Sequence, residues 1–170
     1  MRTTTMAALL ASCLLHAGCS DRPAAALATP VAAGFDTSID TRQLMSWVVD
    51  PSSKVVFGAV ASIVTERGEE QVQPRTDQEW NTIRNNAAML LESGNLLLLE
   101  GRARNAQIQD PQDWNTRARA MSAAARTAID ATDVKDPEAL FDASGEIYQT
   151  CTDCHEKYIF TPASASSGGR

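Results

Sequence analysis

The chain has 170 residues, of which 44% are hydrophobic and 21% are charged. Its 21 aspartates and glutamates against 15 lysines and arginines give a formal net charge of −6, and this acidic balance argues against nucleic acid as a partner. Even without its N-terminal targeting residues, the chain is long enough for one domain with a buried core.

The N-terminus is predicted to be a lipoprotein-type signal peptide, residues 1–19. Arg2 supplies a short positive region, and the apolar stretch after it has the length of a signal peptide rather than of a membrane span. Two cysteines, Cys13 and Cys19, lie where processing could occur. We favour cleavage before Cys19, which would then carry a lipid, because the apolar region before it has a normal length. The alternative is a secreted protein whose cysteine only happens to lie near the cleavage point.

Two segments of simple composition flank the predicted domain. Residues 20–38 are rich in alanine and proline and are expected to form a tether, and residues 161–170 are expected to form a disordered tail. The domain then spans 39–160. We expect the protein in the periplasm of a bacterium, anchored to a membrane by the N-terminal lipid alone, because no other segment is apolar enough to span a bilayer.

The domain is predicted to be all-α. Asp110-Pro111 and Asp136-Pro137 each place a capping side chain before a proline at the first helical position, and Thr76 begins a capping box. Asp50-Pro51 is expected to break or kink the first helix. Apolar stripes of helical period and short connections favour an antiparallel up-down-up-down four-helix bundle, with nothing that has the pattern of a strand. The expected helices are 39–66, 77–100, 111–131 and 137–158.

The most informative motif is Cys151-Thr152-Asp153-Cys154-His155. It holds every cysteine and histidine that lies outside residues 1–19. In the pattern Cys-x-x-Cys-His, two thiols form thioethers with a haem and the imidazole ligates its iron. The motif therefore predicts one covalent haem c per chain, attached through Cys151 and Cys154, with His155 as the proximal iron ligand. Haem c is attached outside the bacterial cytoplasm, which agrees with export.

Three other interpretations use the same residues. A thioredoxin-like dithiol belongs in a βαβ setting, whereas this chain has a helical pattern. A structural zinc site needs four ligands, and the mature chain offers three cysteine and histidine groups. A disulfide across two intervening residues closes too short a loop to stabilise the fold much. Covalent haem is the favoured interpretation.

A single haem motif on the last helix of an exported bundle resembles the cytochrome c′ family. The resemblance covers about residues 39–160 and includes Thr41-Arg42-Gln43 in the first helix and Cys151-x-x-Cys154-His155-x-x-Tyr158 in the last. The chain departs from the family where Ile159 replaces a usual basic residue, and where Pro51 interrupts a helix that is normally continuous. The resemblance implies frequent homodimers and a five-coordinate iron, with Ser46 at the distal position.

Antiparallel helices would bring three other helix ends level with His155: the start of the first, the end of the second and the start of the third. Met45 then ranks first as a distal ligand, and a thioether there would suit electron transfer. The alternative is that Met45 only fills a gap in the core. Met89 and Met121 are expected farther along the helix axes. The other residues expected around the haem are Leu44, Val48, Asn95, Leu98, Leu99 and Trp114.

Arg102 and Arg104 follow the second helix at the haem end, where they could pair with the propionates or lie solvated at the surface. The sequence has no recognisable second catalytic constellation, so we do not predict an enzyme. The favoured function is an electron carrier that serves redox partner proteins of the envelope. One alternative is a five-coordinate module that binds NO or CO. Another is a non-redox envelope lipoprotein with a structural haem.

Overall fold

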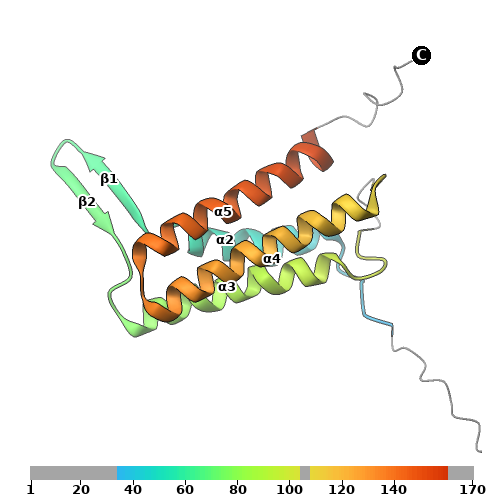
Figure 1. Cartoon of the computed structure of the whole chain (residues 1–170), viewed down its shortest axis with the longest axis horizontal. Coiled ribbons are helices and arrows are strands. Elements are labelled where there is room, and N and C mark those ends of the chain that lie inside the picture. The colour runs from blue at the N-terminus through green and yellow to red at the C-terminus, as the bar shows by residue number, and fades with distance from the viewer. Residues whose placement is uncertain (1–33, 104–107, 161–170) are drawn as a thin grey trace, which may run out of the picture. The chain divides into compact units, whose positions relative to one another are not determined.

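The computed structural model describes residues 34–103 and 108–160, and this part of the chain is mostly helical (Figure 1). The predicted helical class is confirmed, with the addition of a small two-stranded sheet. The predicted signal peptide, Cys19, Arg104 and the C-terminal tail lie outside the described residues, as does most of the tether.

The first helical region comprises α1 (Thr41–Leu44), the π-helical segment η1 (Met45–Val49) and α2 (Asp50–Phe57). Asp40 begins it with a capping box, since its side chain accepts from the Gln43 N–H and the Gln43 side chain accepts from the Asp40 N–H. The chain stays helical through Pro51. The expected interruption takes the form of η1, and Pro51 falls in the first turn of α2, where its missing N–H costs little.

The prediction that the first helix continues to residue 66 is wrong. Helix α2 ends at Phe57, and the next residues form a hairpin of β1 (Ala61–Thr65) and β2 (Gly68–Val72), with Ile63 opposite Glu70. The residues of β1 include the β-branched run from Ile63 to Thr65, which favours a strand. Gly68 has a φ of 124°, a conformation that glycine adopts readily at a turn.

The later helices are α3 (Asp77–Leu97), α4 (Pro111–Val134) and α5 (Pro137–His155), followed by the π-helical segment η2 (Glu156–Phe160). Their predicted starts are confirmed. Asp110 and Asp136 each accept two backbone N–H groups of the first turn, and Thr76 forms its capping box with Glu79. Helix α4 ends later than predicted, at Val134, and its C-cap Lys135 adopts a left-handed conformation with a φ of 55°.

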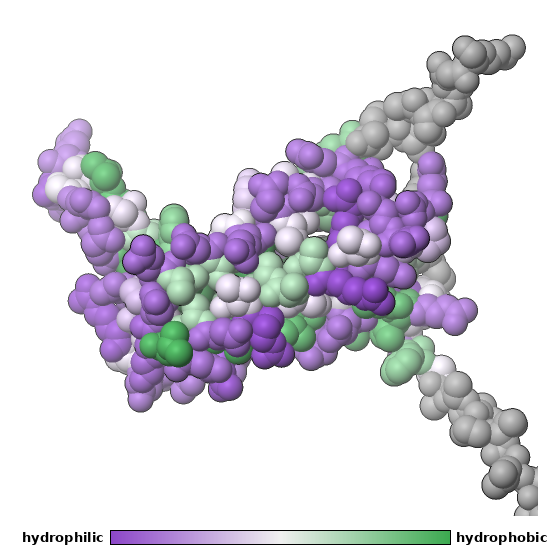
Figure 2. Space-filling model, in the orientation of Figure 1, coloured by the Kyte–Doolittle hydropathy of each residue, from purple (hydrophilic) through white to green (hydrophobic). Residues whose placement is uncertain are grey.

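Helix α4 packs against both α3 and α5, and small side chains allow the helices to approach closely. Gly94 on α3 faces Ser122 and the backbone of Ala118 on α4. Trp80 and Trp114 are buried, as expected of core anchors. Figure 2 shows hydrophilic side chains over much of the face in view, with paler and apolar residues between them along the helices. The fully buried residues include Val56, Ala87, Leu90, Ala125, Ala128, Leu140 and Ile147.

Candidate haem site

The residues of the Cys-x-x-Cys-His motif occupy the last turns of α5. Cys151, Cys154 and His155 are all half-buried, and their spacing of three and four residues places them on one side of the helix. Both cysteines are free thiols. The ring of His155 makes an edge-on contact with Phe160 of η2, with 6.5 Å between the ring centroids.

A small cavity of about 30 Å³ lies beside the two thiols. It is almost entirely apolar and draws residues from η1, α3, α4 and α5. Its lining residues are Met45, Val49, Leu97, Trp114, Arg117, Ala118, Met121, Thr150, Cys151 and Cys154.

A larger cavity of about 770 Å³ lies next to the small one and shares Met45 and Trp114 with it. Its volume falls within the range of roughly 300–1,000 Å³ that is usual for ligand pockets. The other residues that line it are Asp40, Thr41, Arg42, Ser46, Tyr158 and Ile159.

Burial raises the pKa of both thiols. For Cys151 it outweighs a hydrogen bond with Thr150, and for Cys154 it outweighs the favourable charge of Arg117. A reactive redox dithiol of the thioredoxin kind needs the opposite shift. In addition, residues 34–103 and 108–160 contain no group of three or more histidine, cysteine, aspartate and glutamate side chains that could hold a metal ion. The two thiols therefore do not have the surroundings of a zinc or thioredoxin-like site.

The donor set and its surroundings fit a haem c. Two thiols one turn apart can form the two thioethers, the imidazole beside them can ligate the iron, and apolar walls can exclude water from the macrocycle. Met45 lines the same cavity as Cys151 and Cys154.

The structure brings together only some of the residues predicted around the haem. Met45 and Trp114 line the cavity, while Asn95 is exposed and Val49 and Leu97 take the places expected for Val48 and Leu98. A π-helical turn holds more residues than an α-helical one and so changes which residue of η1 faces inward. Met121, expected farther along the axis, also lines the cavity beside the thiols.

Trp114 and Tyr158 form the wall between α4 and the end of α5. The Trp114 Nε1–H donates to the Leu97 carbonyl at 3.0 Å, and the ring of Trp114 packs edge-on against Tyr158 with 5.1 Å between centroids. Tyr158 also donates its hydroxyl to Asp113 at 2.8 Å. Burial, followed by this bond, raises the pKa of Tyr158, so its phenol stays protonated.

Arg102 is only 5% exposed, and its guanidinium donates to the backbone carbonyls of Ile39 and Asp36. Its Nε is buried without a partner. The Arg102 carbonyl accepts from the hydroxyl of Thr41, which lines the large cavity. Pairing of Arg102 with a propionate stays a prediction. Arg42 also lines the large cavity. It was not among the predicted site residues, although its place in Thr41-Arg42-Gln43 was a signal.

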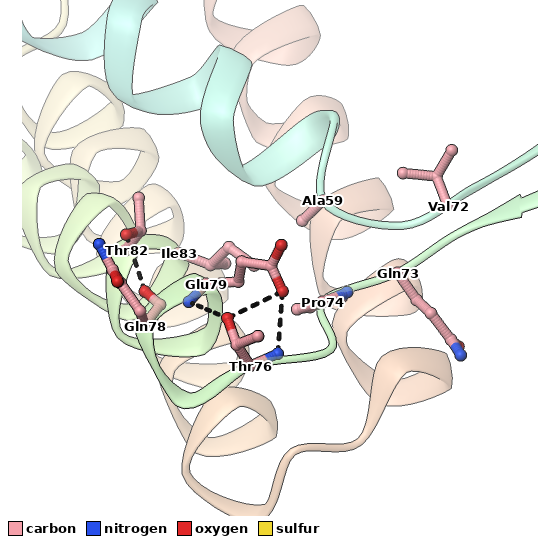
Figure 3. Close-up of a pocket in the computed structure, with 9 residues that line it drawn as sticks. All are labelled: Ala59, Val72, Gln73, Pro74, Thr76, Gln78, Glu79, Thr82 and Ile83. Carbon is pink, nitrogen blue, oxygen red and sulfur yellow. Dashed lines mark hydrogen bonds between the residues drawn. The ribbon is translucent and has the colours of Figure 1, made fainter.

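Another cavity, of about 470 Å³, lies between the hairpin and the start of α3 (Figure 3). Thr76 and Glu79 line it, but the Glu79 carboxylate already accepts from the Thr76 hydroxyl and from the backbone N–H groups of Thr76 and Arg75. Neither a cysteine nor a histidine lines this cavity, so it is not the candidate site.

Among models of protein families, the one described as Cytochrome C' matches residues 54–158. The matched region is more than half of the chain and contains the complete Cys-x-x-Cys-His motif, whereas Arg42 and Met45 lie before it. No curated protein and no solved structure matches the chain. In the part of the chain that the structure describes, no helix has both the length and the apolar character needed to cross a membrane.

Proposed function

Because the chain belongs to the cytochrome c′ family, we propose that it is an exported monohaem c-type cytochrome that carries electrons, with His155 and Met45 as axial iron ligands. Membership of the family supports a haem c protein that either transfers electrons or binds a gas. The choice between these two depends on the distal side of the iron. Met45 beside the two thiols is the observation that favours the electron carrier.

In this proposal the chain's own residues hold the cofactor and exclude water. Cys151 and Cys154 anchor it through thioethers, and His155 ligates it from the same helix. The bound haem supplies one-electron chemistry between Fe(III) and Fe(II). A thioether from Met45 would close the sixth position and raise the reduction potential, and burial by Val49, Leu97 and Trp114 would act in the same direction.

The proposed architecture is the antiparallel four-helix bundle predicted above, with α1 to α2 as its first helix. The contacts of α4 with both α3 and α5 support it. So does the alternating direction of the colour gradient along α3, α4 and α5 in Figure 1.

The absorption spectrum of the purified holoprotein tests the ligand assignment. We expect a low-spin ferric spectrum with the weak red band of a thioether-ligated haem, lost in Met45→Ala and retained in Met89→Ala. Met89 is a suitable control because it is 47% exposed on α3 and lines neither cavity beside α5. If the band instead disappears only in Met121→Ala, Met121 is the ligand and the assignment of Met45 is wrong.

The gas-binding alternative predicts a high-spin spectrum and rapid formation of a stable adduct when CO meets the ferrous protein. An electron carrier with a closed sixth position should react with CO slowly or not at all. A structural haem in a non-redox lipoprotein would be excluded by rapid oxidation of the ferrous protein by an envelope partner.

We further propose that the protein is anchored in the periplasm through a lipid on Cys19. Members of the family are typically periplasmic, and attachment of haem c requires export. Mass spectrometry of the mature N-terminus tests this proposal, since a diacylglyceryl group on Cys19 supports it and an unmodified N-terminus after another cleavage site contradicts it. We expect redox partner proteins of the envelope, and no enzymatic activity of its own.

A further inference from the structure

Two side chains of α4 bind the chain on both sides of His155, at the end of α5 and in η2. Asp113 accepts from the Tyr158 hydroxyl at 2.8 Å and from the Lys157 ammonium at 3.0 Å. Arg117, one turn later on α4, donates through Nη1 to the Asp153 carbonyl at 2.8 Å. The points held on α5 and η2 thus lie two residues before His155 and two and three residues after it.

The two α4 residues also bind each other. Arg117 Nε donates to Asp113 Oδ2 at 2.8 Å, and this pairing, the largest of several contributions, lowers the pKa of Asp113. Their side chains are only 26% and 23% exposed, so solvent screens the pair less than it would at the open surface. Arg117 in addition lines the small cavity together with Cys151 and Cys154.

Arg117 binds where the helical pattern changes. The α-helical pattern of α5 gives way to the π-helical pattern of η2 directly after His155. A guanidinium donating to Asp153 fixes the carbonyl just before the Cys154-His155 pair. The Asp113 carboxylate fixes the first turn after it, through Lys157 and Tyr158. The turn that carries the imidazole is therefore held at both ends by one neighbouring helix.

We propose that Asp113 and Arg117 are positioning residues for His155, which set the orientation of its imidazole toward the iron. This inference rests on the proposed haem ligation by His155, and it assigns to the pair a role beyond joining two helices. By contrast, the ion pair of Arg84 with Asp133, at 2.8 Å, joins α3 to α4 with both side chains about half exposed and touches neither cavity at the end of α5. It makes a matched control.

Ferric EPR spectra and reduction potentials of the holoprotein test the proposal in Asp113→Asn, Arg117→Gln and the control Asp133→Asn. We expect both cluster variants to show the same second set of EPR signals, absent from the wild type and from the control. A pure charge effect would instead move the potential in opposite directions in the two variants, because one loses a negative charge and the other a positive charge. Opposite shifts with unchanged EPR signals would overturn the proposal, as would a lower melting temperature with no other change.

Tyr158→Phe gives the same test if Asp113→Asn does not fold. It removes one donor to Asp113 and keeps the ring against Trp114. A partial form of the new EPR signals supports the proposal, and a wild-type spectrum overturns it. Failure of the proposed function itself has a different signature, since the wild-type protein would then lack covalent haem or a histidine-ligated iron.

Discussion

Replacement of Gly94 by alanine should destabilise the protein, although alanine is the better helix former. A Cβ at Gly94 would lie 2.0 Å from the Ser122 hydroxyl oxygen, 2.7 Å from the Ala118 carbonyl oxygen and 3.2 Å from Ser122 Cβ. The hydroxyl can rotate away, but only by giving up its bond to the Leu91 carbonyl at 2.8 Å. The Ala118 carbonyl is backbone, so α3 and α4 must separate.

The size of the loss in unfolding free energy follows from three contributions, two unfavourable and one favourable. Overpacking costs about 1–3 kcal/mol, the lost hydrogen bond costs about 1 kcal/mol, and helix propensity returns about 1 kcal/mol. We therefore expect Gly94→Ala to lower the free energy of unfolding by about 2 kcal/mol, which corresponds to a melting temperature lower by roughly 5–10 °C.

Thermal unfolding of the holoprotein, followed by circular dichroism, measures this effect. Gly145→Ala is the matched control, because Gly145 lies exposed in α5 and a Cβ there meets nothing within 4 Å. That variant should be more stable than the wild type by up to about 1 kcal/mol. A Gly94→Ala protein that is as stable as Gly145→Ala would refute the close approach of α3 and α4. The same contact positions Ala118, which lines the cavity beside the thiols.

Three further predictions concern stability in acid, proteolysis of the residues just before α1, and removal of the hairpin. The hydrogen bond from Arg117 is the largest contribution that lowers the pKa of Asp113, so the ionised carboxylate stabilises the fold fully above its unfolded pKa of about 4, and this stabilisation is lost as pH falls further. In acid titrations, the difference in free energy of unfolding between wild type and Asp113→Asn should therefore become smaller below that pH, and a constant difference would contradict this. Arg102→Leu removes the donor to the Ile39 carbonyl and should speed proteolysis just before α1, whereas an unchanged cleavage rate would show that the bond is dispensable. A short Gly/Ser linker in place of residues 61–72 should leave the haem spectrum unaltered, because the hairpin contributes no residue to either cavity beside α5, and an altered spectrum would contradict that separation.

Helix starts could be predicted from the sequence because their signals are local. Asp110, Asp136 and Thr76 each satisfy backbone N–H groups within three residues, so composition at those positions decides the outcome. The hairpin was missed because its β-branched run follows a helical pattern without a proline between them. Gly68, whose φ is positive, follows the turn between β1 and β2, but a glycine at that place in a sequence marks the end of a helix equally well.

The cysteines and the histidine of the candidate site could be predicted from the sequence, but the residues that line the cavity beside them could be predicted less well. Cys151, Cys154 and His155 are adjacent in sequence, so one motif contains them all. The residues that line the cavity depend on how each helix is rotated about its axis, and these helices come from distant parts of the chain. The π-helical segment η1 changes this rotation, and no residue type in the sequence indicates it. The ion pair of Asp113 with Lys157 and its hydrogen bond from Tyr158 join residues more than forty positions apart, and no sequence motif predicts them.

The proposed function depends above all on a covalent haem carried by the two thiols of α5. Intact-mass spectrometry after acid extraction tests it most directly, on protein produced in a bacterium that attaches haem c. We predict a mass increase of one haem that survives extraction in the wild type and is lost when Cys151 and Cys154 are both replaced by serine. A wild-type chain that has only the mass of its polypeptide, or whose haem is removed by the acid, would contradict the account.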